Sequence, residues 1–138
     1  MTDICTKHFY WDAERLPKDY NEELEMNYPE DGYPSIYIKP YGYKNEPIIY
    51  SEVGGYTLDL YNKVEKHFGY GKVDSSKELL EKVIFLCKEF DKRKKWIHGF
   101  CYTELYDQFQ EINGLLTINR EPKFTPELLK KEIDKLFY

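Results

Sequence analysis

The stretch Pro47-Ile48-Ile49-Tyr50-Ser51-Glu52-Val53-Gly54-Gly55-Tyr56 decides how we interpret this chain of 138 residues. The residues before Glu52 suit a buried strand, which we place over residues 47–51. The carboxylate of Glu52 follows at once, and the two glycines after it allow a sharp turn. The pattern predicts an acid held rigidly at the rim of a sheet.

Further strands are predicted on both sides of this stretch. Residues 2–10 and residues 97–103 read as short strands. Two long connections, residues 11–45 and residues 54–74, are rich in tyrosine, and the first holds a short helix near residues 19–26. Long ordered loops of this kind are usually functional.

Two amphipathic helices complete the pattern. The first begins at Ser75, whose side chain and that of Glu78 form a capping box. The second begins at Thr125 and has Pro126 at its first helical position. Apolar residues recur at helical spacing in both: Leu79, Val83, Leu86, Cys87 and Phe90 in the first, and Leu128, Leu129, Ile133 and Leu136 in the second.

The order of the elements is strand, loop, strand, helix, strand, helix. That order predicts an α/β domain, residues 1–138, in which a parallel sheet is packed against outer helices. A complete (β/α)8 barrel takes about 250 residues. We therefore expect a partial barrel with about three parallel strands.

Charge and cysteine content exclude several classes of function. The net charge is −5, which disfavours nucleic-acid binding, and residues 91–95 form one basic cluster that fits a solvated helix end. No run is long enough to span a membrane and no signal peptide is visible, so a cytoplasmic protein is expected. Cys5, Cys87 and Cys101 lack metal spacing and are expected to be buried and reduced; neither a metal nor a cofactor is predicted.

Three segments resemble the end of the catalytic barrel of family 2 glycoside hydrolases, the β-galactosidase and β-glucuronidase group. Residues 2–10 resemble its sixth strand, although Phe9 replaces an acid there. Residues 47–55 resemble the seventh strand, with Val53 as a departure. Residues 99–123 resemble the eighth strand and its loop. The most specific part is the run Asp107, Gln110, Glu111, Asn113, Gly114 and Leu115, beside which Phe109 departs from a common acid.

The resemblance implies that Glu52 is the catalytic nucleophile of a retaining β-glycosidase. In the family the general acid/base follows the fourth strand in an Asn-Glu pair, which has no counterpart in this chain. A retaining mechanism needs two carboxyl groups about 5 to 5.5 Å apart. The isolated chain is therefore expected to be inactive unless another acid substitutes, and four acids are open to that role: Asp59, Glu104, Asp107 and Glu111.

Four side chains are predicted to bind substrate: His8, Tyr10, Trp11 and Tyr102. For His8 a hydrogen-bonded histidine near the rim is an equal alternative, and for the aromatic residues the alternative is core packing. Asp107, Glu111 and Asn113 are expected to fix the loop after the last strand through side-chain to backbone bonds.

Two functional hypotheses follow. In the first, the chain is a piece of a retaining β-glycosidase and its partner is a β-linked carbohydrate. In the second, it is a non-catalytic module that binds carbohydrate through its tyrosine-rich loops, or associates with copies of itself through open sheet edges and an apolar inner face.

Overall fold

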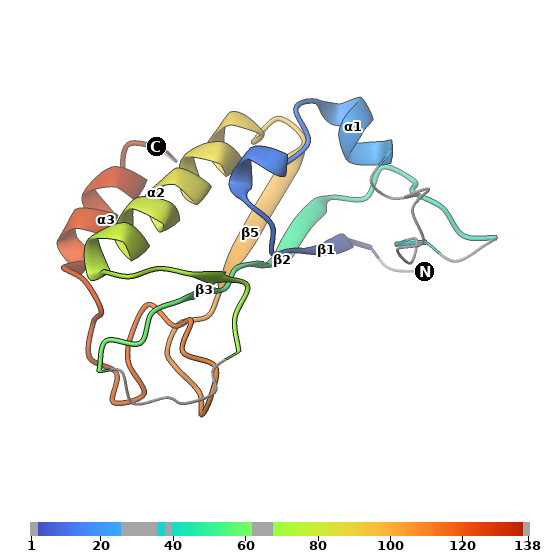
Figure 1. The fold of residues 1–138 in the computed structure, drawn as a ribbon. Coiled ribbons are helices and arrows are strands. Elements are labelled where there is room, and N and C mark those ends of the chain that lie inside the picture. Colours follow the sequence, from blue (N-terminus) through green and yellow to red (C-terminus); the bar gives the residue numbers. More distant parts are fainter. Residues whose placement is uncertain (1–2, 26–35, 38–39, 62–67, 137–138) are drawn as a thin grey trace.

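A central three-stranded parallel sheet organises the molecule. The fold is taken from a computed structural model that describes residues 3–25, 36–37, 40–61 and 68–136. The sheet consists of β1 (Cys5–Phe9), β2 (Ile48–Gly54) and β5 (Ile97–Thr103) in the order β1-β2-β5. The strands have open outer edges in the described part of the chain and form no closed barrel. The parallel, partial-barrel sheet predicted from the sequence is confirmed (Figure 1).

The helices of the described segments lie on one side of this sheet (Figure 1). They are α1 (Tyr20–Glu25), α2 (Ser76–Lys92) and α3 (Pro126–Ile133), together with the short 3₁₀ helix η1 (Ala13–Arg15). The loops that follow β2 and β5 meet at the carboxyl ends of the strands, where the backbone N–H of Leu58 donates to the carbonyl of Ile112 at 3.1 Å.

Helix α2 begins and packs as the sequence predicted. The Ser75 hydroxyl accepts a hydrogen bond from the backbone N–H of Glu78 at 3.1 Å, and the Glu78 carboxylate accepts one from the N–H of Asp74 at 2.9 Å. All five predicted core residues of this helix are buried. The ring of Phe90 stacks on Phe100 of β5 at 4.4 Å between centroids, which fixes the helix on the sheet.

Helix α3 departs from the prediction that it buries an apolar stripe. It lies against α2 and none of its residues is fully buried; Leu128 is 51% exposed. Leu129, Ile133 and Leu136 are only partly buried against the core. Thr125 makes no side-chain cap hydrogen bond. The helix packs on another helix at the edge of the molecule, so its apolar positions meet fewer neighbours than those of α2.

The two faces of the sheet differ sharply. Because side chains alternate along a strand, one face points at the helices; this covered face is formed by Cys5, Lys7, Phe9, Ile48, Tyr50, Val53, Ile97 and Phe100. The other, which we call the open face, carries Thr6, His8, Ile49, Ser51, Glu52 and Cys101. An apolar inner face was expected, and the open face is instead mainly polar.

The covered face contains a buried ion pair that the sequence did not indicate. The Lys7 ammonium binds the Glu23 carboxylate, and the Tyr50 hydroxyl donates to the same carboxylate at 2.9 Å. Glu23 is 0% exposed and Lys7 is 5% exposed. A buried charge of this kind is tolerated only because it is paired and hydrogen-bonded. The pair attaches the short helix α1 to β1.

The long connection after β2 is more ordered than predicted. Strand β2 runs through Glu52 to Gly54 instead of ending at Ser51, because Gly54 pairs with Thr103 of β5. Within the expected loop, β3 (Tyr56–Thr57) pairs in parallel with β4 (Gly71–Lys72). Backbone hydrogen bonding to distant strands creates both features, and a local pattern does not reveal them.

Two expectations about single side chains were wrong. Cys101 is exposed, because strand alternation places it on the open face; Cys5 and Cys87 are buried as expected. Arg93 belongs to the basic cluster expected to be solvated, but it is 7% exposed. Its guanidinium donates to the carbonyl of Pro17 at 2.6 Å and to the Glu89 carboxylate at 2.8 Å, which ties the end of α2 to the segment after η1.

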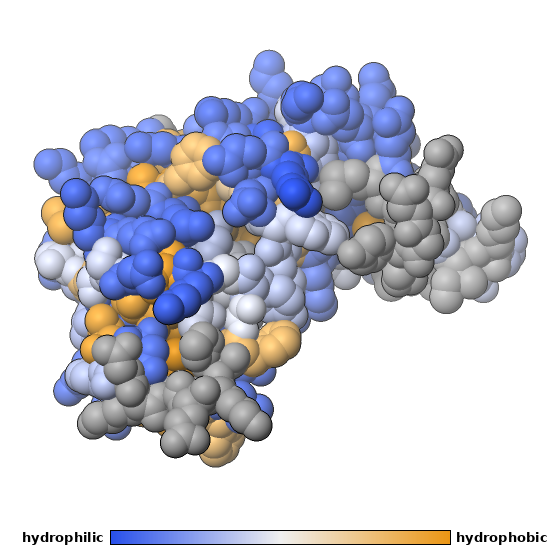
Figure 2. All heavy atoms as spheres, viewed as in Figure 1, coloured by the Kyte–Doolittle hydropathy of each residue, from blue (hydrophilic) through white to orange (hydrophobic). Residues whose placement is uncertain are grey.

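The surface is largely hydrophilic over α1 and the helix layer, with smaller hydrophobic areas between charged side chains (Figure 2). Among the helices that the structure describes, none combines the length and the apolar character needed to cross a membrane.

Candidate active site

A β-bulge aims the carboxylate of Glu52 at the open face. The pairing of β1 with β2 shifts its register between Lys7 and His8, so that Ser51 is the extra residue and Glu52 lies opposite His8. Bulges of this kind re-aim side chains and occur often beside active sites. Glu52 therefore stands at the carboxyl end of the central strand, on the same face as His8.

Two neighbours hold one oxygen of this carboxylate. The Tyr10 hydroxyl donates to Oε2 of Glu52 at 2.6 Å, and Nδ1 of His8 lies 3.2 Å from the same oxygen. The Glu52 side chain is 42% exposed, so solvent still reaches the group. Burial, with the hydrogen bond to Glu52, raises the pKa of Tyr10 well above its usual range. Tyr10 is therefore a neutral phenol, able to donate, throughout the physiological range.

Both positions of the Gly54-Gly55 turn require glycine, because of their backbone conformation and because neighbouring rings lie close to them. Gly54 has a backbone φ of 90° and Gly55 one of 67°, values that residues other than glycine rarely adopt. A Cβ atom on Gly54 would lie 2.3 Å from the Tyr102 ring, and one on Gly55 would lie 2.8 Å from the Tyr70 ring. The sharp turn predicted from the sequence is thus also a place where aromatic rings approach the backbone.

The structure brings together three of the five predicted site residues. Glu52, His8 and Tyr10 form one hydrogen-bonded cluster. Trp11 instead packs edge-on against Phe9, at 5.5 Å between ring centroids. Tyr102 packs beneath the glycine turn, and its hydroxyl donates to the carbonyl of Asn113 at 3.3 Å. Substrate binding by these side chains stays a prediction.

Sequence reasoning missed two aromatic residues near the cluster. Tyr70 stacks on Tyr10 with a centroid distance of 3.6 Å and an interplanar angle of 14°. Phe68 meets Tyr70 edge-on at 5.3 Å. Both residues belong to the tyrosine-rich connection after β2, which the sequence did reveal. The position of Tyr70 over Tyr10, however, depends on the pairing of β3 with β4.

A buried lysine organises the loop after β5. Nζ of Lys123 donates to the Asp107 carboxylate at 2.7 Å and to the carbonyls of Leu58 and Ile112 at 3.1 and 2.8 Å. Asp107 also accepts from the backbone N–H of Gly114 at 2.9 Å, as predicted. The same prediction was wrong for Asn113, whose buried side chain makes no hydrogen bond within the described residues. Burial lowers the pKa of Lys123, although Asp107 opposes that shift. Asp107 therefore has a structural role, and the importance of Lys123 was not foreseen.

Glu104 is a second acid at the carboxyl end of the sheet, in surroundings that differ from those of Glu52. It follows β5 directly, and its Oε1 atom is buried with no hydrogen-bond partner among the described residues. Its other oxygen accepts from Gln108 at 2.5 Å. Burial and the nearby Glu111 and Asp107 carboxylates raise the pKa of Glu104. The environment of Glu104 thus favours its protonated form, which a general acid requires.

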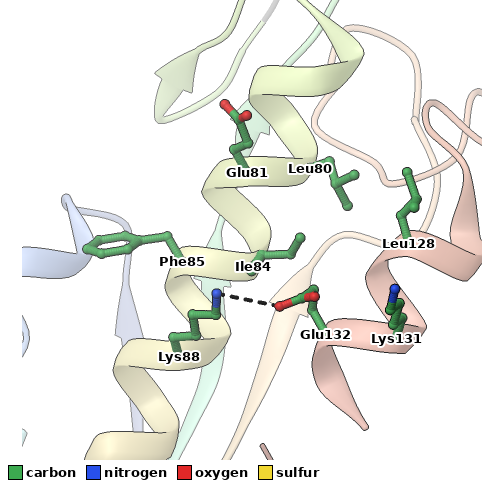
Figure 3. A pocket seen from close by; sticks show the side chains of 8 residues that line it. All are labelled: Leu80, Glu81, Ile84, Phe85, Lys88, Leu128, Lys131 and Glu132. Carbon is green, nitrogen blue, oxygen red and sulfur yellow. Dashed lines mark ion pairs between the residues drawn. The ribbon is translucent and has the colours of Figure 1, made fainter. Parts of the chain in front are cut away.

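A hollow lies on the outer side of the helix layer, away from Glu52. It measures about 530 Å³ and is lined by apolar and charged residues of α2 and α3 in equal number, the apolar ones being Leu80, Ile84, Phe85 and Leu128 (Figure 3). An ion pair of 3.6 Å joins Lys88 to Glu132 across it. Its two carboxylates, Glu81 and Glu132, come from different helices, and the second is paired with Lys88. Among the residues that the structure describes, no cluster of side chains could hold a metal ion.

Comparison with known proteins was informative at the level of fold. No family model and no curated protein matches the sequence. Among solved structures, similar ones include the β-glucuronidase of Bifidobacterium dentium in complex with coumarin-3-O-glucuronide (21% identity, TM-score 0.51) and the β-D-glucuronidase of Dictyoglomus thermophilum (18%, 0.54). The β-glucuronidase of Faecalibacterium prausnitzii is also similar (19%, 0.50).

Each alignment covers 96% of this chain but only 21 to 22% of the other protein. This chain therefore has the fold of about one fifth of a β-glucuronidase, which confirms the resemblance in fold expected from the sequence. The superpositions establish the shared fold alone, because the identities lie near 20%, and the chemistry has to be argued from the site itself.

Proposed function

We propose that this chain is the C-terminal part of the catalytic barrel of a retaining β-glycosidase, with Glu52 as its nucleophile. The observation that supports this most is the state of the Glu52 carboxylate. It stands at the carboxyl end of the central strand, one oxygen is held by Tyr10 and His8, and the side chain is accessible from the open face. In barrel enzymes of this kind, catalytic residues come from the carboxyl ends of the strands.

In the proposed reaction, Oε1 of Glu52 attacks the anomeric carbon of a β-linked glycoside. A glycosyl ester forms as the bond to the leaving oxygen breaks, and water later cleaves that ester. The hydrogen bond from Tyr10 and the contact with His8 keep Oε2 fixed, so that Oε1 points toward substrate. The leaving oxygen needs a proton, which in the resembled family comes from an acid on the fourth strand.

The acid on the fourth strand belongs to a part of the barrel that has no counterpart here. Loss of general acid catalysis alone typically costs about 10²- to 10⁴-fold in rate. The chain by itself is therefore expected to show little or no turnover. Robust hydrolysis by the isolated chain would instead make Glu104, with its raised pKa, the first acid to test.

A chimera tests the nucleophile directly. The matching fifth of the Dictyoglomus thermophilum enzyme is replaced by this chain, and the product is treated with a 2-deoxy-2-fluoro-β-glucuronyl fluoride that traps the glycosyl ester. Mass spectrometry of the digest should place the label on Glu52. The E52Q chimera should carry no label, while E111Q, which changes an exposed acid at the same end, should still be labelled. A label on another residue would refute the assignment.

The genetic context gives an independent and simpler test. We would sequence the DNA upstream of the Met1 codon. An in-frame continuation containing a strand-like run followed by an Asn-Glu pair would support a piece of an active hydrolase. A stop codon or promoter there would support a free-standing, non-catalytic protein.

One observation favours that second function. In the described segments, β1 and β5 each pair only with β2, which leaves a backbone edge open on either side of the sheet. Open edges invite pairing with another strand. The alternative is thus a self-associating or carbohydrate-binding module derived from the same fold. Sedimentation of the isolated chain decides between them, because an oligomer supports the module and a monomer without affinity for β-glycosides opposes it.

A further inference from the structure

The ring of Tyr70 covers one face of the Tyr10 ring beside the proposed nucleophile. The two rings are nearly parallel, with an interplanar angle of 14° and 3.6 Å between their centroids. The hydroxyl of Tyr10 donates to Oε2 of Glu52 at 2.6 Å. A movement of the Tyr10 ring therefore moves the hydroxyl that holds the carboxylate.

The backbone of Tyr70 is attached to the glycine turn that follows Glu52. Its N–H donates to the carbonyl of Gly55 at 3.1 Å. A Cβ atom on Gly55 would lie 2.8 Å from the Tyr70 ring and 3.1 Å from the Tyr10 ring, so both rings lie against this glycine. The stack of the two rings is thus fixed relative to the end of β2.

The segment that carries Tyr70 is also held on both sides of that residue. On one side β4 pairs in parallel with β3. On the other side the backbone N–H of Phe68 donates to the carbonyl of Gln110, in the loop after β5, at 2.9 Å. Gly69 permits this close approach, because a Cβ atom there would lie 1.6 Å from Oγ1 of Thr57. Tyr70 is therefore presented from a fixed backbone.

Tyr10 needs such a support because it follows the last residue of β1, where strand pairing no longer fixes the chain. A tyrosine side chain can rotate about two bonds, and packing selects among its staggered positions. The stack with Tyr70 supplies that packing on one face of the ring. Burial and the hydrogen bond to Glu52 raise the pKa of Tyr10 well above its usual range. The covered phenol keeps its proton for the bond with Glu52.

We propose that Tyr70 is a positioning residue for the nucleophile, which acts by holding the Tyr10 hydroxyl on Oε2 of Glu52. The inference rests on the proposed function, because it takes Glu52 as the residue that attacks the sugar. With Oε2 held, Oε1 keeps its direction toward the anomeric carbon, and such orientation lowers the barrier to attack. Tyr70 acts through the ring of Tyr10 and needs no contact with substrate.

The first experiment follows the Tyr10 phenol in the isolated 138-residue chain, so it does not require catalysis. NMR of chains labelled with ¹³C at Cζ of tyrosine reports the ionisation of each phenol, and Tyr10→Phe assigns the signal. In Tyr70→Leu the pKa of Tyr10 should fall toward its ordinary value of 10, because the ring loses its cover. At about pH 10.5 Tyr10 should then be partly ionised in Tyr70→Leu and neutral in Tyr70→Phe.

The second experiment measures the rate at which the fluoroglycoside labels Glu52 in the chimera. Tyr70→Leu should slow labelling at saturating inactivator by about 10- to 100-fold, the range expected when a reacting group is misplaced by up to 1 Å. The inactivator concentration at half-saturation should change little, because orientation and not binding is lost. Tyr70→Phe keeps the stacked ring and should rescue the rate.

The matched control is Phe85→Leu. It exchanges a 39% exposed aromatic ring for leucine in the hollow between α2 and α3, so it should change neither the Tyr10 phenol nor the labelling rate. Circular dichroism establishes that each variant is folded.

Three results would overturn the inference: a Tyr10 phenol that stays neutral in Tyr70→Leu, equal labelling rates in Tyr70→Leu and Tyr70→Phe, or a change in half-saturation alone. Its failure is separable from failure of the proposed function. Glu52 labelled at an unchanged rate in Tyr70→Leu would leave the nucleophile standing without this support. A lowered pKa of Tyr10 with no label on Glu52 in any chimera would refute both and leave the stack as a structural contact.

Discussion

A glutamate on the covered face of the sheet and a glutamate on the open face have opposite environments. On the covered face, Glu23 is 0% exposed, and a lysine and a tyrosine hydroxyl satisfy its carboxylate. On the open face, Glu52 is 42% exposed at its side chain, and a tyrosine and a histidine hold one of its oxygens. The first carboxylate is fully used in holding α1 against β1, whereas the second keeps an oxygen available for a ligand.

This difference in burial and pairing separates a structural carboxylate from a candidate functional one without any information on sequence conservation. A buried carboxylate paired with a lysine is expected to have a structural role, because removing either partner leaves an uncompensated charge. A carboxylate that is held by a tyrosine hydroxyl and a histidine and is open to solvent stabilises the fold little. We therefore expect substitutions on the two faces to separate stability from binding and reactivity, and the following tests run from the largest effect to the smallest.

The largest effect should come from Lys7→Met. Glu23 would then remain buried without its cation, which typically costs about 3 to 5 kcal/mol of unfolding free energy. Urea denaturation measures the loss. The matched change on the open face, Glu52→Gln, should alter stability by less than about 0.5 kcal/mol. Equal losses from the two substitutions would contradict the distinction between the faces.

Gly54→Ala should have the next largest effect. The new Cβ atom would meet the Tyr102 ring at 2.3 Å on a residue with φ of 90°, and overpacking of this kind typically costs about 1 to 3 kcal/mol. Gly99→Ala is the control, because a Cβ atom there meets no atom within 4 Å. Thermal unfolding should show a lower midpoint for the first variant only. A similar unfolding midpoint for both variants would show that the glycine turn can rearrange to accept the added methyl group.

Glu104→Gln should raise stability at neutral pH. The folded state raises the pKa of Glu104 above its ordinary value of 4.5, so the stability tied to its proton is fully present below that value and is lost as the pH rises through the folded pKa. Glutamine mimics the protonated form at every pH. The midpoint of unfolding should therefore be higher than that of the unchanged protein at pH 7, and the gain should vanish below about pH 4. A gain that is independent of pH would exclude this cause.

Thiol reactivity is the smallest perturbation and the most direct test of the open face. Cys101 is exposed there, whereas Cys5 and Cys87 are buried, and burial raises the pKa of Cys87 to about 11. Titration of the native protein with a thiol reagent at pH 8 should therefore modify one cysteine quickly, and Cys101→Ser should abolish that phase. A slow reaction of all thiols would mean that a second copy or another partner covers the open face.

Much of this fold follows from local patterns. The capping box at Ser75, the apolar spacing of α2 and the strand over residues 97–103 all appear where the sequence predicted them. These features depend on residues within a few positions of one another, so a linear reading can find them. The same holds for the turn after Glu52, since only glycine readily adopts its backbone conformation.

Other features depended on contacts between segments far apart in the chain. The bulge that places Glu52 opposite His8, the burial of Lys7 and Lys123, the exposure of Cys101 and the stacking of Tyr70 on Tyr10 each require two or more distant segments to meet. The sequence by itself determined the three strands of the central sheet, the main helices and the glycine turn, and that a carboxylate stands at a strand end. Only the tertiary structure decided which side of the sheet each side chain faces and which oxygen of Glu52 is held, because both depend on pairing register and not on local preference.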